Sequence, residues 1–99
     1  DNPAYYQLLA RAAESLNDQR EAHEALAEYH YLFGRTGLAV EHLQTALRQP
    51  NGTFYMKSRV EARLKILQEE LRSLLQKNHQ MASATPTSFT NLSVRNLAE

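Results

Sequence analysis

The sequence lacks cysteine, and this absence excludes disulfide frameworks and metal sites built from thiolates. It has only three glycines and three prolines, which lie at the ends of apolar-periodic segments or near the termini. No apolar run is long enough to cross a membrane, so direct membrane insertion is not expected. The formal net charge is zero, which argues against nucleic acid as the main partner, because a basic surface is its usual electrostatic footprint.

What remains is a chain of 99 residues dominated by alanine, leucine, glutamate, glutamine and arginine, all good helix formers. This length predicts one domain near the lower end of the usual size range. The chain begins at Asp1 without a methionine, so we expect it to be a piece of a larger protein that carries any address label elsewhere. Residues 1–50 are rich in acids and residues 51–78 in bases, a pattern interpreted as two solvated faces of opposite sign.

Apolar residues recur at helical spacing in four segments, so the sequence predicts an all-α fold, an antiparallel array of helical hairpins. The residues between the segments are typical of turns and caps: Asn17 and Gly34 at helix ends, and Thr53 as an N-cap. The predicted helices cover about 4–16, 19–33, 36–48 and 54–77. They form a helical domain of residues 1–78, followed by an irregular Ser/Thr-rich tail of residues 79–99.

The fourth segment carries a heptad seam, a row of leucines in steps of three and four that suits packing against another helix. A helix over 54–77 is about 36 Å long, longer than the helices before it can cover. We therefore expect the far end of the seam to be covered by the tail, by a second copy of the chain or by an absent domain. The seam residues are Leu64, Leu67, Leu71, Leu74 and Leu75.

An internal repeat is the most informative signal in the sequence. Leu9, Leu26 and Leu43 are each seventeen residues apart, as are Asn17 and Gly34. The pairs Ala10 and Ala27, and Ala22 and Ala39, share this spacing. Seventeen residues are half of the tetratricopeptide period of about 34, the length of one helix with its turn.

The segment 19–50 resembles one whole tetratricopeptide repeat. It has the leucine/small pair at Leu26, the turn glycine at Gly34 and the alanine of the second helix at Ala39. It departs from the pattern at His23 and His30, which stand where the repeat has a tryptophan and a tyrosine. The resemblance implies a helical array whose concave face binds a protein or peptide.

A closer resemblance rests on NPAYYQLLA at 2–10, EAHEALAEY at 21–29 and YMKSRVEARL at 55–64. These stretches are similar to the C-terminal repeat region of bacterial periplasmic zinc metallopeptidases of the BepA type. The resemblance implies a periplasmic parent with an HExxH protease domain that acts in outer-membrane protein assembly and quality control. It also implies that the repeat region contacts protein partners, and that this fragment can contact the absent protease domain.

Catalytic, metal and cofactor motifs are not found in this fragment. His23 and Glu24 begin like HExxH, but the fifth position is Ala27. His23 and His30 are two helical turns apart, about 10 Å, too far for one zinc ion. No nucleophile arrangement or glycine-rich phosphate loop is present, so the sequence predicts no enzyme activity and no cofactor.

A partner is expected on the first helix of the repeat, which lines the concave face in tetratricopeptide arrays. The functional interpretation is an acidic groove with an aromatic anchor, suited to a peptide with basic residues. The alternative is a solvated glutamate face that only keeps the module dispersed in water. The candidate residues are Glu21, Glu24, Glu28, Tyr31 and Leu32.

Two other functions stay open at this stage. The heptad seam could pair two copies, which would make the chain an oligomerisation module. A cytosolic chaperone-binding repeat domain is the third possibility, but such domains usually carry a basic carboxylate clamp, whereas the stripe here is acidic.

Overall fold

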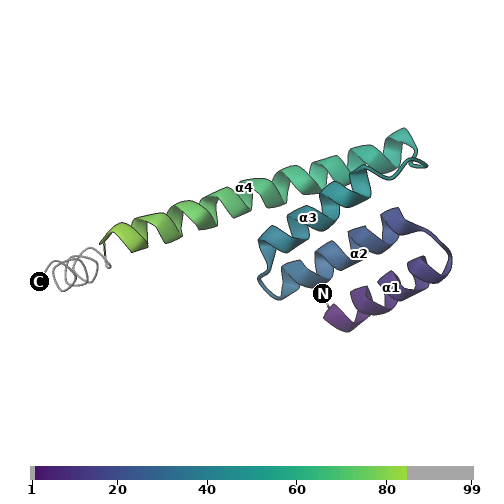
Figure 1. Ribbon diagram of the computed structural model, residues 1–99, viewed down its shortest axis with the longest axis horizontal. Coiled ribbons are helices and arrows are strands. Elements are labelled where there is room, and N and C mark those ends of the chain that lie inside the picture. Colours follow the sequence, from purple (N-terminus) through teal and green to yellow (C-terminus); the bar gives the residue numbers. More distant parts are fainter. Residues whose placement is uncertain (1, 85–99) are drawn as a thin grey trace, which may run out of the picture.

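The computed structural model describes the backbone of residues 2–84 and the side chains of residues 2–78. It contains four α-helices: α1 (Pro3–Ser15), α2 (Gln19–Leu32), α3 (Thr36–Leu47) and α4 (Phe54–Ala84). Each helix packs against the next along the chain, and consecutive helices run in opposite directions (Figure 1). The predicted all-α antiparallel array is confirmed. None of these helices is long and apolar enough to span a membrane.

The ends of α1 and α2 share one capping geometry, and it recurs at the predicted interval of seventeen residues. Asn17 has a φ of 62° and Gly34 a φ of 77°. After α1, the amides of Asn17 and Asp18 donate to the carbonyls of Glu14 and Ala13, at 2.9 and 2.8 Å. The amides of Gly34 and Arg35 make the same two bonds after α2, both at 2.9 Å. Both ends are thus Schellman motifs, which need a left-handed residue at this position.

Helix α4 begins where the sequence predicts and ends later. The Thr53 hydroxyl accepts a hydrogen bond from the Met56 amide at 3.1 Å, so Thr53 is the N-cap. The helix continues to Ala84, seven residues past Lys77. The irregular tail predicted from residue 79 is therefore wrong for 79–84, because Asn78 alone does not end a helix where no glycine or proline follows before Pro86. The rest of the predicted tail lies outside the described residues.

Small side chains let the helices approach closely. The four alanines of the predicted seventeen-residue pairs, Ala10, Ala22, Ala27 and Ala39, are at most 3% exposed. Beside them pack the larger apolar side chains of α3 and α4. This core cluster contains Ala27, Ala39, Val40, Leu43, Ala46, Val60, Leu64 and Leu67, with Tyr31, Leu47 and Leu71 packed against it.

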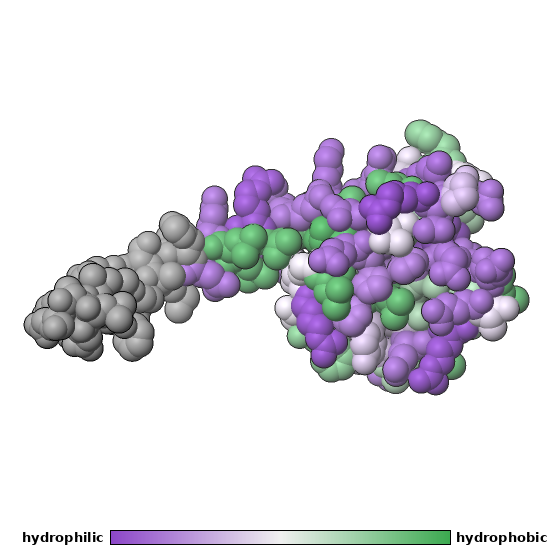
Figure 2. Space-filling view, viewed as in Figure 1, coloured by the Kyte–Doolittle hydropathy of each residue, from purple (hydrophilic) through white to green (hydrophobic). Residues whose placement is uncertain are grey.

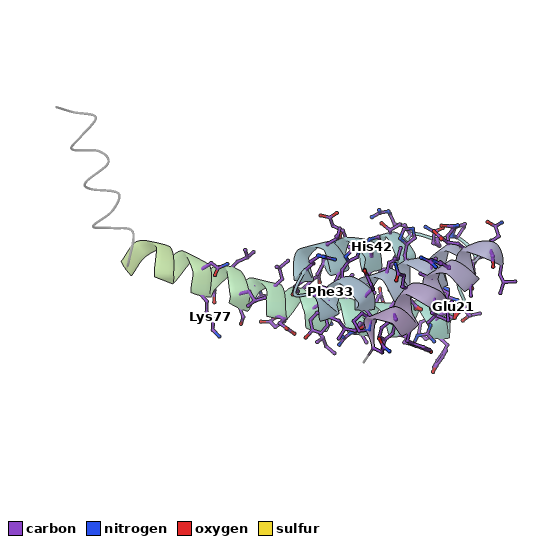
Figure 3. All side chains as sticks on the ribbon, turned by 90° about the horizontal axis from the view of Figure 1, so that it is seen from below. Glu21, Phe33, His42 and Lys77 are labelled. Carbon is purple, nitrogen blue, oxygen red and sulfur yellow. The ribbon has the colours of Figure 1, made fainter. Side chains whose placement is uncertain are left out.

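The second half of α4 projects beyond the other helices (Figure 1). Figure 3 shows Lys77 on this projecting part, away from the block that holds the other labelled side chains. Leu74 is 41% exposed and Leu75 is 58% exposed, and a hydrophobic patch is visible on this stretch in Figure 2. Nothing within the described residues covers these two leucines, and residues 85–99 of the tail, one of the three expected covers, lie outside that range.

Candidate functional site

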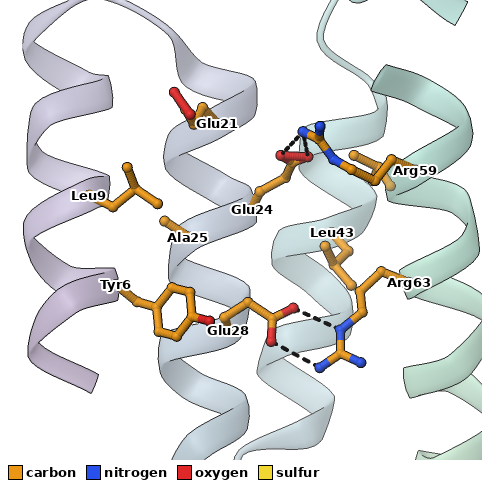
Figure 4. Close-up of a pocket in the computed structure, with 10 residues that line it drawn as sticks. Tyr6, Leu9, Glu21, Glu24, Ala25, Glu28, Leu43, Arg59 and Arg63 are labelled. Atoms are coloured by element: carbon orange, nitrogen blue, oxygen red, sulfur yellow. Dashed lines mark hydrogen bonds and ion pairs between the residues drawn. The ribbon is translucent and has the colours of Figure 1, made fainter. Parts of the chain in front are cut away.

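A groove of about 360 Å³ opens on one face of the array, and all four helices contribute to it. In Figure 4, Tyr6 and Leu9 of α1 form one wall, and Arg59 and Arg63 of α4 form the other. The groove lies over α2 and α3. Its lining residues are Tyr6, Leu9, Glu21, Glu24, Ala25, Glu28, Leu43, Arg59, Val60 and Arg63.

Helical periodicity brings these side chains to one face. Asp18 begins α2 by accepting a hydrogen bond from the Glu21 amide at 3.1 Å, which fixes where the helix starts. Glu21, Ala25 and Glu28 then follow at steps of four and three, so they share one side of α2. The two arginines of α4 are four residues apart and share a face for the same reason.

The opposite wall neutralises two of the three groove glutamates. A nitrogen of Arg59 lies 2.8 Å from a carboxylate oxygen of Glu24. Arg63 makes a two-pronged pair with Glu28, with N–O distances of 2.8 and 2.9 Å. These hydrogen bonds raise the pKa of both guanidinium groups above their usual value. The two pairs connect α2 to α4, and in each pair the partners are 35 residues apart.

Glu24 also accepts a hydrogen bond from Arg20 at 3.2 Å, within α2. Arg20 is only 8% exposed and lies 3.6 Å from the capping Asp18, so one buried guanidinium joins the start of α2 to the groove. Glu21 has no ion-pair partner among the described residues, whereas Glu24 has two. The unpaired negative charge of the groove therefore lies at Glu21.

Tyr31 lies between α2 and α4 rather than in the groove lining. Its hydroxyl donates to the Glu70 carboxylate at 2.9 Å, and the Arg63 guanidinium sits 5.1 Å from its ring centre. The hydrogen bond to Glu70 raises the pKa of Tyr31. Leu32 is 39% exposed and is not a lining residue. The structure thus brings three of the five predicted residues to the groove and places the other two elsewhere.

The groove is less acidic than predicted from the sequence, because two arginines of α4 line it beside the glutamates of α2. Tyr6, Leu9, Arg59 and Arg63 were absent from the predicted set. The signal that could have found the arginines was the excess of bases after residue 50 opposite an excess of acids before it. The acids of the first half and the bases of the second half do not form two separate solvated faces, because Glu24 and Glu28 pair with Arg59 and Arg63 at the groove.

The predicted heptad seam divides into two parts with different surroundings. Leu64 is 9% exposed and Leu67 is 0% exposed, and both belong to the core cluster. Leu71 is partly buried against that cluster. Of the five seam leucines, only Leu74 and Leu75 are exposed. We call these two the distal leucines. The first part of the seam serves the internal core, so it is not free to pair with another chain.

In comparisons with known proteins, no family model, no curated protein and no solved structure matches this chain.

Proposed function

We propose that this chain is a protein-interaction module that docks a peptide segment of a partner protein in the groove. The observation that carries the proposal is the combination of an apolar lining with charged walls. Tyr6 and Leu9, both partly exposed, supply the accessible apolar contacts above a buried floor of Ala25, Leu43 and Val60, and the glutamates and arginines stand around them. Binding sites for peptides and small ligands commonly combine apolar surface with a few placed polar groups.

The occupant that fits is a peptide with one apolar side chain next to a basic residue. A volume of about 360 Å³ accommodates one or two large side chains against Tyr6 and Leu9. A lysine or arginine beside them would pair with Glu21, whose carboxylate has no ion-pair partner among the described side chains. Glu24 and Glu28 would act indirectly, because their pairs with α4 hold the two walls in place.

We further propose that the array is of the tetratricopeptide kind. Helix α3 begins 33 residues after α1, and α4 begins 35 residues after α2, close to the repeat period of about 34. On the resemblance of residues 2–10, 21–29 and 55–64, the parent would be a periplasmic zinc metallopeptidase of the BepA type that acts in outer-membrane assembly quality control. In that setting the fragment would provide partner binding and leave catalysis to the absent protease domain.

The test uses amidated twelve-residue peptides in which one leucine or phenylalanine is followed by lysine, and a matched set with glutamate in place of lysine. Binding is measured by amide chemical-shift changes in the ¹⁵N-labelled chain. We expect shifts clustered on the groove residues and a preference for the lysine set. Glu21→Lys should reverse that preference, whereas Glu14→Lys, at an exposed site of α1 outside the groove, should leave it unchanged. Shifts spread over the whole surface, or no preference between the sets, would remove the proposal.

A second candidate function is self-association through the distal leucines. The observation that favours it is the exposure of Leu74 and Leu75 on the projecting part of α4. Light scattering with Leu74→Glu and Leu75→Glu tests it, since both side chains are exposed and the helical array should stay folded. Self-association is supported if the unmutated chain is a dimer and the dimer disappears in both variants. A monomeric unmutated chain would exclude it. Leu67→Glu is unsuitable for this purpose, because Leu67 is fully buried in the core.

A further inference from the structure

Three histidines from α2 and α3 form a row, which we call the histidine stack. His42 of α3 lies between His23 and His30 of α2, with 5.2 Å between ring centres on both sides. The rings of His30 and His42 are almost parallel, at 5°. The two histidines of α2 are two helical turns apart, and the antiparallel helix α3 places the third ring in the space between them. Figure 3 shows His42 within the helical block.

The nitrogens of one pair face each other. The Nδ1 atoms of His23 and His42 are 3.0 Å apart, whereas the centres of the two rings are 5.2 Å apart. The difference is nearly twice the distance from the centre of an imidazole ring to one of its atoms. The two Nδ1 atoms therefore lie close to the line between the rings, which is the geometry of a nearly straight N–H···N hydrogen bond. A metal ion on this line would be about 1.5 Å from each nitrogen, against about 2.0 Å in real sites. No group of three or more His, Cys, Asp or Glu side chains among the described residues is placed so that it could hold a metal ion, the three histidines included.

The protonation states of this pair follow from its geometry. When both rings are neutral, one carries its proton on Nδ1 and donates it to the bare Nδ1 of the other. A first added proton binds Nε2 of the donor ring and leaves the bond intact, now with one positive charge. A second added proton has to occupy the accepting Nδ1. Two N–H groups would then point at each other, and the bond between α2 and α3 would be lost.

Burial and nearby positive charge lower the pKa of two of the three rings, His30 and His42. Burial, followed by the nearby rings of His23 and His30, lowers the pKa of His42, and Glu41 on α3 opposes this in part. Burial and the Arg35 guanidinium lower the pKa of His30, and a nitrogen of Arg35 lies 3.2 Å from its Nδ1. No carboxylate pairs with any of the three rings in the described structure.

We propose that the His23–His42 pair is a proton-sensitive lock between α2 and α3, which holds the two helices together while at most one proton has been added and releases them when a second binds. Each member of the pair directly precedes a groove residue, since His23 is followed by Glu24 and His42 by Leu43. Release would thus displace the groove lining and weaken peptide docking in acid. This consequence for docking rests on the proposed function, whereas the lock itself does not.

The sign of the pH effect is fixed by the lowered pKa of His42. In the unfolded chain a histidine binds a proton near its ordinary pKa of about 6.5. Below that pH the unfolded state therefore takes up protons that the folded state refuses. The contribution of His42 to the free energy of unfolding is therefore fully present above about pH 6.5 and is lost as the pH falls below that value.

The test compares thermal unfolding at pH 7.5 and pH 5.5, where most carboxylates remain charged. We expect the melting temperature of the unmutated chain to be lower at pH 5.5 than at pH 7.5 by about 4–8 °C. His42→Asn places an uncharged amide where the imidazole stood, and the fall should be less than half as large. His23→Asn is the second variant if the first fails to fold. Equal falls in the parent chain and in a folded variant would overturn the lock.

A second readout separates this proposal from peptide docking. Side-chain ¹⁵N spectra at pH 7.5 should show that one ring of the pair has a protonated Nδ1 and the other a bare Nδ1. If both rings carry their proton on Nε2 instead, the lock is overturned. The leucine–lysine peptide should bind the unmutated chain more weakly at pH 5.5 than at pH 7.5. It should bind the His42→Asn variant about equally at the two pH values. If that peptide binds at neither pH, the docking function fails, while the melting comparison still decides the lock.

Discussion

The division of the α4 leucine seam can be tested with one chemical change at two positions. Leu67 and Leu74 are seven residues apart and occupy equivalent positions of the heptad, yet Leu67 is 0% exposed and Leu74 is 41% exposed. Replacing a fully buried leucine by alanine removes its transfer free energy and leaves a cavity, at a cost of about 2–5 kcal/mol. We therefore expect Leu67→Ala to lose that much of the free energy of unfolding, a large share of the roughly 5–15 kcal/mol typical of a small domain.

Leu74→Ala is the matched variant on the same helix. Its side chain is not among those packed against the core cluster, and alanine favours a helix slightly more than leucine does. The expected loss is below about 1 kcal/mol. Urea unfolding followed by circular dichroism measures both values, with similar slopes as the check that only stability has changed. Comparable losses in the two variants would refute the reasoning, because the distal part of α4 would then be as well covered as its first part.

Three further predictions concern caps, backbone and charge. Gly34→Ala should lose about 1–2 kcal/mol because φ there is 77°, whereas Gly37→Ala, with nothing within 4 Å of the added carbon, should be neutral or gain up to about 1 kcal/mol. Asp18→Ala should lose about 1 kcal/mol with the α2 N-cap, measured by thermal unfolding. A double-mutant cycle with Glu28→Gln and Arg63→Met should give a coupling of about 1 kcal/mol that weakens at high salt.

These predictions have internal controls. Glu69 and Arg72 also form a pair at 2.8 Å, but their side chains are 67% and 63% exposed. A cycle on this pair should give no more than about 0.5 kcal/mol, because solvent screens exposed charges. A coupling as large as that across the groove would contradict the structural argument. For the glycines, equal effects at both positions would contradict the assigned backbone conformations.

The sequence predicted the helices and their turns because these depend on residues close together in the chain. The seventeen-residue pairing of Asn17 and Gly34 identified two helix ends with the same cap, and the spaced alanines identified close helix contacts. The predicted end of α4 is wrong by seven residues, because Asn78 is only a weak stop signal. The conformation of a helix end is decided by the whole local sequence, and here no strong breaker follows within the helix.

The site was only partly predictable. The steps of three and four along α2 are sufficient to place Glu21 and Glu28 on one face. They do not show which side chains stand opposite, so the pairing of Glu24 and Glu28 with α4 arginines 35 residues away could not be predicted. For the same reason the sequence does not show that His42 of α3 lies between the two histidines of α2.

By itself, the sequence determined the all-helical class, the antiparallel order and the interval at which the array repeats, because hydrophobic periodicity and turn preferences act over one or two helical turns. Only the tertiary structure decided that two of the three groove glutamates are paired with arginines, that the leucine seam divides into a buried and an exposed part, and that three histidines meet. Those outcomes depend on the rotation and offset of each helix against its neighbour. Close packing around the buried alanines sets both, and no single segment contains that information.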